Sequence, residues 1–271
     1  MPELPEVETT CRGIAPHVLG GTILNVIVRE PRLRVRVRDD LAALLRGQRV
    51  QAVERRGKYL WLRCQDGCLV VHLGMSGSLC IVPCARAPRK HDHIDIQFDS
   101  NQCLRLHDPR RFGVMLWSVG DPLRHPLLKD IGLEPLSDAL DGDYFYGRSR
   151  GRRLTVKQFI MDGRVVAGVG NIYANEALHH AGISPLRQAG RISRRRYQCL
   201  AQAIKTVLDE AIAAGGTTLR DFYSGEGSPG YFKQHLRVYQ RDGEPCQRCG
   251  RPIRALRLGQ RASFYCTSCQ R

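Results

Sequence analysis

Apolar and polar residues alternate with a period of two in the first half of the chain and with a period near 3.6 later. Between residues 22 and 119, short β-prone runs are separated by Gly, Pro, Asp and Asn. These runs cover 22–28, 50–53, 59–63, 69–73, 79–82, 93–98, 103–106 and 114–119. The preceding residues 3–18 predict a helix, because Pro5 lies in the first turn and acidic residues crowd its start. Eight strands and one helix predict a β-sandwich of two sheets.

Residues 32–38 carry a second alternation, of arginine with Leu33, Val35 and Val37. This pattern predicts a further strand with one apolar and one basic face. Such a basic face is usually only solvated, and contact with nucleic acid is the alternative.

The second half of the chain is predicted to be helical. Residues 120–150 are rich in Pro, Gly and Asp and are interpreted as a connection. Helices are then predicted over 155–161 and 171–180, the second with Asn171 as N-cap. Ser193 is expected to cap a long third helix that ends at Gly215 and Gly216. Residues 216–236 are rich in Gly and Ser and predict a loop around 224–230.

The spacing of four cysteines at the end of the chain predicts a metal site. Two Cys-x-x-Cys pairs, separated by sixteen residues, are formed by Cys246, Cys249, Cys266 and Cys269. A hairpin between the pairs, with its turn at Gly259 and Gln260, would bring both pairs together around one Zn²⁺. Four thiolates leave no open coordination position, so the predicted zinc is structural. Seven other cysteines show no such spacing; those in the strand-like segments are interpreted as small buried hydrophobic residues.

Composition narrows the class of protein. The 271 residues include 42 Lys and Arg against 26 Asp and Glu, which gives a net charge of +16. We therefore expect a polyanionic partner, most plausibly nucleic acid. No apolar run approaches the roughly 18 residues of a membrane span, and no secretory signal is evident. An odd number of cysteines, 11, without an export signal argues against a disulfide framework.

The beginning of the chain offers the sharpest candidate chemistry. Removal of Met1 would leave Pro2 with a secondary amine, and α-amino groups have pKa values near 7.7–8.0. Such an amine can attack a sugar C1′ and form an iminium that promotes elimination. Glu3 and Glu6 are close enough in sequence to act as acid or base. Taken alone, these residues also suit an ordinary helix start.

Further positions combine basic and apolar groups. Lys58 begins a strand and is interpreted as a surface lysine or a phosphate contact. Arg110 and Phe112 lie on one predicted loop, where a guanidinium beside an apolar wedge suits insertion into a base stack. Met75 is predicted on a glycine-flanked turn, and both Met75 and Phe112 suit a hydrophobic core equally well. Asn171 opens a helix whose N–H groups could hold a phosphate.

These motifs together resemble bacterial formamidopyrimidine-DNA glycosylase along the full chain. The resemblance rests on segments 1–8, 56–58, 72–77, 108–113 and 168–173 and on the four-cysteine tail. It implies an α+β fold with an N-terminal β-sandwich and leading helix, a helix–two-turn–helix domain and a C-terminal zinc ribbon. The expected domains are 1–134, 135–236 and 237–271.

The resemblance also implies an activity and its residues. The expected enzyme excises 8-oxoguanine and formamidopyrimidines from damaged double-stranded DNA and cuts the strand by β,δ-elimination. Pro2 would be the Schiff-base nucleophile, Glu3 the general acid–base, and Glu6 would support the site. Lys58 would serve β-elimination, and Arg261 δ-elimination. The expected DNA contacts are His91, Arg110, Arg152, His72, Met75, Phe112, Lys157 and Asn171.

We further expect a cytoplasmic, nucleoid-associated bacterial monomer that needs one structural zinc and no nucleotide cofactor or membrane. One alternative is an endonuclease VIII-type glycosylase for oxidised pyrimidines. The segment around Leu4 and Val7 and the Met75–Arg110–Phe112 set argue against it. Another is a non-catalytic zinc-ribbon nucleic-acid-binding protein, which explains the charge and the cysteines but not Pro2 and Glu3.

Overall fold

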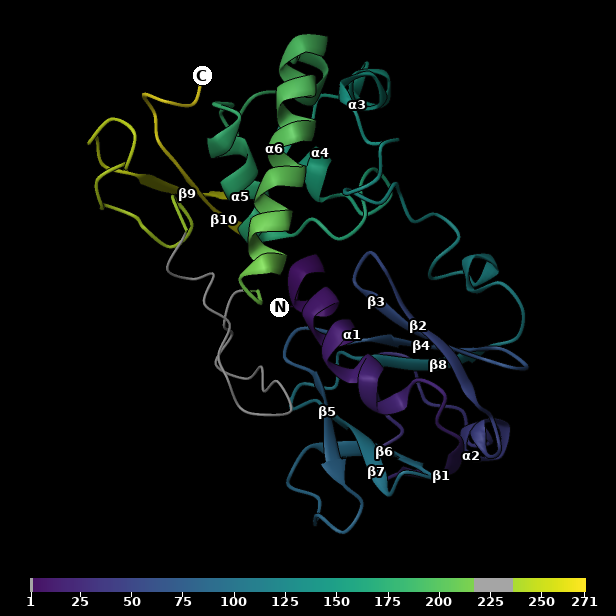
Figure 1. Ribbon diagram of the computed structural model, residues 1–271. Coiled ribbons are helices and arrows are strands. Elements are labelled where there is room, and N and C mark those ends of the chain that lie inside the picture. The colour runs from purple at the N-terminus through teal and green to yellow at the C-terminus, as the bar shows by residue number, and fades with distance from the viewer. Residues whose placement is uncertain (1, 217–235) are drawn as a thin grey trace. The chain divides into compact units, whose positions relative to one another are not determined.

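The computed structural model describes residues 2–216 and 236–271, which divide into two compact units (Figure 1). The first unit contains residues 2–129 with Gly215 and Gly216, and the second contains 130–214 and 236–271. The loop predicted at 224–230 lies outside the described residues. The three expected domains, 1–134, 135–236 and 237–271, stay predictions.

The first unit is built on two antiparallel four-stranded sheets. One has the strand order β1-β6-β7-β5 and the other β2-β3-β4-β8. Each strand matches one of the eight predicted runs. The strands are β1 Ile23–Val28, β2 Val50–Arg56, β3 Tyr59–Cys64, β4 Cys68–His72, β5 Ser78–Pro83, β6 Asp92–Phe98, β7 Gln102–His107 and β8 Val114–Ser118.

A single hydrophobic core joins the two sheets. Leu60 and Leu62 of β3 face the same core as Ile94 and Ile96 of β6, and all four side chains are fully buried. The leading helix α1 (Leu4–Val18) contributes its apolar residues to this core and packs against strands of both sheets. The short helix α2 (Leu41–Leu45) packs against β1 and β8. Both helices therefore close the sandwich, as Figure 1 shows for α1.

The strand predicted over residues 32–38 is wrong. The segment is irregular, and the N–H groups of Leu33 and Val37 both bond to the carbonyl of Pro31. Leu33 and Val37 are nevertheless buried in the core, while the arginines between them are exposed. The alternation therefore predicts correctly which residues are buried, but these residues reach the core from a local turn and not from a strand of a sheet.

The second unit is mainly helical. Its helices are α3 (Gly142–Ser149), α4 (Val156–Met161), α5 (Asn171–His180) and α6 (Arg194–Ala213). Helix α3 corrects the interpretation of 120–150 as a mere connection; the Asp141 side chain caps it by accepting the N–H of Tyr144. Short 3-10 turns occur at Pro122–Arg124, in the first unit, and at Ala189–Arg191. Three aromatic rings, Phe145, Phe159 and Tyr197, pack together between α3, α4 and α6.

The ends of the predicted helices agree with the structure to within one residue. Ser193 caps α6 by accepting the N–H of Arg196, and Gly215 has a positive φ of 77° beyond its end. The predicted N-cap Asn171 is instead the first residue of α5, and Gly170 occupies the cap. The C-terminal hairpin pairs β9 (Arg254–Leu258) with β10 (Arg261–Tyr265) across the predicted two-residue turn.

Candidate functional site

The first turn of α1 buries two carboxyl groups. Glu3 is 2% exposed and Glu6 is 1% exposed, and Pro2 beside them is also buried. Glu6 Oε2 accepts the backbone N–H of Glu3 at 2.8 Å, which is one half of a capping box. The Glu3 side chain accepts the backbone N–H of Glu6 in return, so both carboxyl groups take part in the cap. Acidic side chains are nevertheless rarely this buried. Gly216 has a φ of 80°, and a Cβ there would lie 3.2 Å from Glu6 Oε1, so glycine is favoured where the chain passes this carboxylate.

An ion pair connects α1 to the turn that carries Lys58. Arg55 Nε of β2 donates to Glu8 Oε2 at 2.7 Å, and Arg55 Nη1 donates to the carbonyl of Gly57 at 3.0 Å. Burial raises the pKa of Glu8, but hydrogen bonds from Arg55 and Arg12 outweigh it and leave the pKa below its usual value. The start of α1 and the Lys58 turn are thus fixed to one framework.

His72 at the end of β4 is held in one tautomer. Its Nδ1 accepts the N–H of Gly74 at 2.9 Å, so the proton of the neutral ring lies on Nε2. Burial, followed by repulsion from Lys58 and Arg34, lowers the pKa of His72 to about 4. Above that pH, the ring is a neutral donor close to two cationic side chains.

The structure brings the turn of Met75 against the loop of Arg110 and Phe112. Gly74 has a φ of 66°, and a Cβ there would lie 2.4 Å from the carbonyl carbon of Phe112. Only glycine allows this approach. The Phe112 side chain is 42% exposed, and the Arg110 guanidinium lies 5.0 Å from its ring centre. Asp108 secures the loop, because its Oδ2 accepts the N–H of Gly113 at 2.7 Å.

His91 occupies a strained turn before β6. Its φ is 74°, a conformation that a residue other than glycine adopts at an energetic cost. The Asp92 carboxylate holds the turn by accepting the N–H of Arg89 at 2.7 Å and bonding His107 Nδ1 at 2.8 Å. The rings of His91 and His107 meet edge to face at 6.1 Å.

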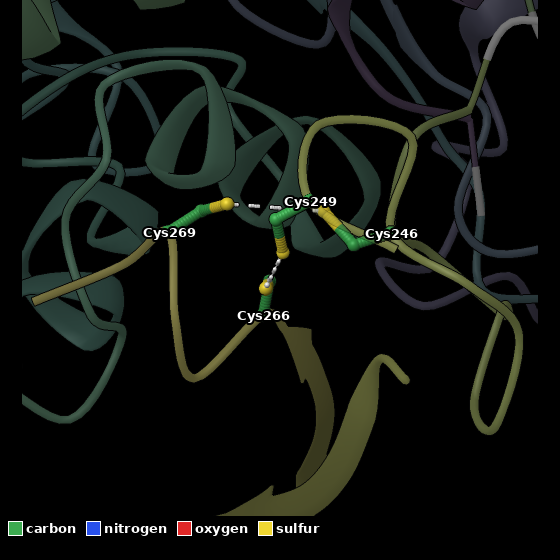
Figure 2. A group of neighbouring side chains, drawn as sticks. All are labelled: Cys246, Cys249, Cys266 and Cys269. Carbon is green, nitrogen blue, oxygen red and sulfur yellow. Dashed lines mark hydrogen bonds between the residues drawn. The ribbon is translucent and has the colours of Figure 1, made fainter. Parts of the chain in front are cut away.

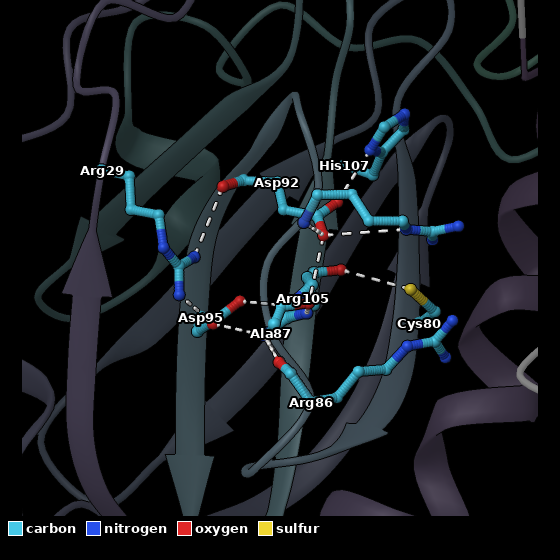
Figure 3. A network of polar contacts seen from close by, with 9 residues as sticks. Arg29, Cys80, Arg86, Ala87, Asp92, Asp95, Arg105 and His107 are labelled. Atoms are coloured by element: carbon cyan, nitrogen blue, oxygen red, sulfur yellow. Dashed lines mark hydrogen bonds and ion pairs between the residues drawn. The ribbon is translucent and has the colours of Figure 1, made fainter.

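Asp92 also belongs to a buried ionic network, in which Arg105 Nη1 lies 3.5 Å from its carboxylate (Figure 3). Asp95 of β6 accepts Nε and Nη2 of Arg105 at 2.7 and 2.8 Å, and it also pairs with Arg29. Burial acts to raise the pKa of Asp95, but these guanidinium groups keep it below the usual value. Arg105 also donates to the carbonyls of Arg86 and Ala87, which ties the loop preceding His91 to the sheet.

In the second unit, Lys157 and Arg261 line one cavity of about 220 Å³. Lys157 is 1% exposed, and its Nζ donates to the carbonyl of Ala262 and to Ser263 Oγ, both at 2.7 Å. Its charge therefore lies directly behind the hairpin whose first residue after the turn is the exposed Arg261. A phosphate contact by Lys157 stays a prediction.

Asn171 and Arg152 occupy the remaining predicted positions in this unit. Asn171 lies in the first turn of α5, and its Oδ1 is buried without a hydrogen-bond partner in the described part of the chain. Arg152 is half-buried; its Nε donates to the carbonyl of Arg148, and its guanidinium lies 5.9 Å from the Phe159 ring centre.

The four C-terminal cysteines converge as predicted (Figure 2). Their Sγ atoms all lie within 4.8 Å of one another, with 3.5 Å between Cys249 and Cys266 and 4.0 Å between Cys246 and Cys269. Tetrahedral Zn²⁺ with Zn–S bonds of about 2.3 Å requires Sγ–Sγ distances of roughly 3.8 Å. The donor set therefore fits Zn²⁺. The backbone N–H of Arg251, with help from Cys266, lowers the pKa of the Cys249 thiol to about 7.

Two buried acids in the site regions were not singled out from the sequence. Asp108 is fully buried within a motif that was recognised for its arginines. Glu176 of α5 is 3% exposed and accepts the N–H groups of Arg237, Val238 and Tyr239 at 2.8–3.0 Å. The sequence feature that could have identified Glu176 is its charge on the buried side of a helix.

Three family profiles match consecutive parts of the chain. They are the formamidopyrimidine-DNA glycosylase N-terminal domain over residues 1–115, its H2TH domain over 131–223, and the zinc finger found in FPG and IleRS over 243–271. The formamidopyrimidine-DNA glycosylase of Methylococcus capsulatus is 59% identical across 100% of both chains. The chain belongs to the formamidopyrimidine-DNA glycosylase family. The formamidopyrimidine-DNA glycosylase of Stutzerimonas stutzeri is 58% identical to this chain, also across 100% of both chains.

Solved glycosylase structures share the fold. The Thermus thermophilus MutM (Fpg) protein has a TM-score of 0.89 at 38% identity and covers 99% of this chain and 98% of its own. A Lactococcus lactis Fpg mutant in complex with Fapy-dG-containing DNA has a TM-score of 0.92 at 33% identity, with 99% of each chain covered.

Membership of this glycosylase family confirms the predicted family, the α+β fold and a base-excision repair enzyme with glycosylase and abasic-site lyase activities. The zinc-finger profile and the cysteine cluster confirm one structural zinc. The alternatives of an endonuclease VIII-type enzyme and of a non-catalytic ribbon protein are not favoured. No helix in the described ranges is long and apolar enough to span a membrane.

Proposed function

We propose that this enzyme excises 8-oxoguanine and formamidopyrimidines from double-stranded DNA through the Pro2 amine and then nicks the strand by β,δ-elimination. The observation that carries this proposal is the burial of Glu3 and Glu6 beside Pro2 at the start of α1. Both carboxyl groups take part in the capping box, but a cap does not require them to be buried, and two nearly inaccessible carboxyl groups suit proton transfer at a desolvated reaction centre.

Base excision uses the amine as nucleophile. After removal of Met1, the Pro2 nitrogen attacks C1′, the bond from C1′ to the base breaks, and the base leaves with a proton. Glu3 supplies or removes protons at these atoms, and Glu6 keeps Glu3 oriented through the capping box. The first product is an aminal, in which C1′ is bonded to both the Pro2 nitrogen and O4′. Cleavage of the C1′–O4′ bond, with a proton delivered to O4′, then opens the sugar ring and leaves an iminium between the Pro2 nitrogen and C1′.

Strand cleavage follows from that iminium. It acidifies the C2′ proton, and loss of this proton expels the 3′ phosphate; a second elimination expels the 5′ phosphate. We assign the first proton transfer to Lys58 and the second elimination to Arg261. Zinc takes no part in these steps, because four cysteines fill its coordination sphere and its contribution is to hold the ribbon together.

The remaining residues bind and open the duplex. Extrusion of the target nucleotide from the duplex costs a few kcal/mol. Side chains that fill the vacated space offset this cost. We assign this filling to Met75, Arg110 and Phe112, because their two loops touch and the Phe112 ring is exposed. His72, His91, Arg152, Lys157 and Asn171 are assigned to DNA contacts. The neutral Nε2–H of His72 suits a phosphate oxygen.

Borohydride trapping on a duplex containing 8-oxoguanine tests the nucleophile. We expect a covalent adduct that mass spectrometry locates at Pro2. An adduct on Lys58, with Pro2 unmodified, would reject the N-terminal mechanism.

Glu3→Gln tests the acid–base role, with Glu54→Gln as the matched control in the same unit. The Glu54 side chain is 45% exposed and pairs with Arg63, so its variant should keep base excision nearly intact. Glu3→Gln should lose about 10²–10⁴-fold in excision of 8-oxoguanine. The same variant should lose less on a pre-formed abasic site, where no glycosidic bond remains. Equal losses on both substrates would contradict this role.

Lesion preference requires a direct comparison. A Lactococcus lactis Fpg has been solved with DNA that contains an oxidised pyrimidine, so a pyrimidine lesion must be included. We expect faster turnover of 8-oxoguanine opposite cytosine than of thymine glycol; the reverse order would favour the endonuclease VIII-type alternative. We also propose a monomer without a nucleotide cofactor that works in the bacterial cytoplasm on nucleoid DNA. Solved complexes of its neighbours with damaged DNA support the DNA substrate in this proposal.

A further inference from the structure

Helix α5 holds the zinc ribbon through side chains on one face. Asn175 Oδ1 accepts the N–H of Phe264 at 2.9 Å, and Glu176 accepts three consecutive N–H groups from Arg237 to Tyr239. One turn further along the helix, His179 reaches a cysteine of the metal site: its Nε2 lies 3.6 Å from Cys246 Sγ. The first two contacts are to backbone atoms, so His179 differs by touching the cluster itself.

The His179 ring is buried in an unusual state. The residue is 0% exposed, and its Nδ1 finds no hydrogen-bond partner in the described part of the chain. A buried polar atom without a partner is unfavourable, so an imidazole would be a poor choice here if only packing mattered. An aromatic hydrocarbon ring would fill the same space without that penalty. Among the residues that the structure describes, the contact to Cys246 is therefore the polar interaction of the ring that can justify a histidine.

The protonation of the two partners determines what this contact is. A cysteine that binds Zn²⁺ has lost its thiol proton and can only accept a hydrogen bond. The His179 proton must then lie on Nε2, which leaves the orphaned Nδ1 as an unprotonated acceptor. A bond from a neutral N–H to a thiolate is charge-assisted and stronger than one between a thiol and an imidazole. The arrangement thus suits the zinc-loaded state better than a free thiol.

The surroundings keep the ring in place. Arg248, two residues after Cys246, donates to the carbonyls of His179 and His180 at 3.0 and 3.2 Å. These bonds tie the Cys246–Cys249 turn to the last turn of α5, where a cation is also favoured by the helix dipole. Cys246 is itself buried, whereas Cys249 of the same turn is exposed.

We propose that His179 is a positioning residue of the metal centre, which donates its Nε2–H to the Cys246 thiolate and thereby strengthens zinc retention by the ribbon. The role goes beyond the proposed function, because it concerns how the helical part of the unit secures the metal. Hydrogen-bonded groups that orient metal ligands typically change metal affinity 10- to 100-fold when they are removed.

Zinc competition with a chromophoric chelator tests the proposal without DNA, so its outcome is independent of lesion specificity. His179→Phe keeps an aromatic ring but no donor, and it should bind Zn²⁺ about 10- to 100-fold more weakly. His179→Gln retains an N–H donor and should remain close to the native chain. His180→Phe is the matched control, since the His180 side chain makes no hydrogen bond to a cysteine within the described residues; its affinity should be unchanged.

Cobalt substitution gives a second readout. Loss of a hydrogen bond to a thiolate raises the energy of its electrons, so the sulfur-to-cobalt charge-transfer band of His179→Phe should move to longer wavelength. A native-like affinity and band in His179→Phe would overturn the proposal. Equal weakening in His179→Phe and His179→Gln would also overturn it, because packing alone would then explain the effect. Circular dichroism at saturating Zn²⁺ verifies that each variant is folded.

Discussion

The β-sandwich and the zinc ribbon solve the same stability problem by different means. The sandwich buries a continuous core that includes Leu60, Phe98 and the apolar side of α1. The apolar cluster of the ribbon is far smaller, and its buried members are Val238, Ile253 and two cysteines, Cys246 and Cys266. Hydrophobic burial scales with the size of a fold, so a segment of this length needs a staple. The comparison teaches that zinc is part of the ribbon's core, while the sandwich depends on packing and one buried ionic network.

Removal of zinc should have the largest effect, because it should unfold one of the two regions and leave the other folded. Structural zinc contributes apparent folding free energies of about 10–16 kcal/mol in zinc-finger peptides. Chelation, or Cys249→Ser, should therefore unfold the ribbon and abolish most DNA affinity while the sandwich stays folded. Hydrogen exchange should show lost protection in 236–271 and native protection in the strands of the first unit. Cys199→Ser, at an exposed cysteine on α6, is the control. A metal-free protein that binds DNA normally would contradict the prediction.

A cavity in the sandwich should have the next largest effect. Leu60 is fully buried, so Leu60→Ala should lower the free energy of unfolding by about 2–5 kcal/mol. Urea denaturation measures this loss, and the zinc content should remain one per chain. Leu24→Ala, at a side chain that is 52% exposed, should change little. Loss of zinc in Leu60→Ala would show that the two regions are not independent.

The ionic network should contribute less than the core to the free energy of unfolding, and its contribution should depend on pH. Asp95→Asn removes the closer of the two buried counter-charges of Arg105, since Asp92 remains 3.5 Å away, and should cost about 3 kcal/mol at neutral pH. Because the pKa of Asp95 is lowered on folding, its contribution is complete above the unfolded value of 3.8 and is lost as pH falls through the lower folded value. Native and variant unfolding curves should therefore begin to approach one another as the pH falls below about 3.8, and they should meet below the folded pKa.

The control for this network is Asp39→Asn, because the Asp39 side chain is 82% exposed. It should leave unfolding unchanged at every pH. An Asp95→Asn difference that persists in acid would assign the effect to packing and not to charge.

The smallest effect is expected at the surface of the sandwich. Arg38 donates to both oxygens of Asp40 at 2.8 and 2.6 Å, and these bonds lower the pKa of the carboxyl. Both side chains are more than half exposed, so water and salt screen the pair. Asp40→Asn should leave the thermal midpoint unchanged within error. A loss of stability as large as that of Asp95→Asn would show that the exposure of the Arg38–Asp40 pair does not make it weaker than the buried Arg105–Asp95 pair.

The strands and most helix ends were predictable from sequence because periodicity reports burial directly. It does not report which backbone produces that burial, and this explains the error at 32–38. There, Pro31 accepts from Leu33 and Val37, and the two buried residues face the core from a turn. Helix α3 was missed because Gly142 and Gly147 obscured its pattern, although Asp141 is an ordinary cap.

The candidate site was predictable where its residues lie in short motifs, as around Pro2, Phe112 and the cysteines. The interactions that organise these motifs join distant residues and leave no local pattern. Lys157 contacts Ser263 across 106 positions, and His179 approaches Cys246 across 67. No periodicity or spacing specifies such partners, so only the fold reveals that Lys157 supports the hairpin of Arg261.

The last two residues of the chain have a consequence for protein engineering. Gln270 is buried, accepts the N–H of Cys266 and donates to the carbonyl of Ile183, while the Arg271 N–H bonds to the carbonyl of Gly182. A purification tag fused directly after Arg271 would begin next to these hydrogen bonds. A flexible glycine–serine spacer, or a tag inserted at an exposed turn such as that around Gly120, would leave the ribbon undisturbed.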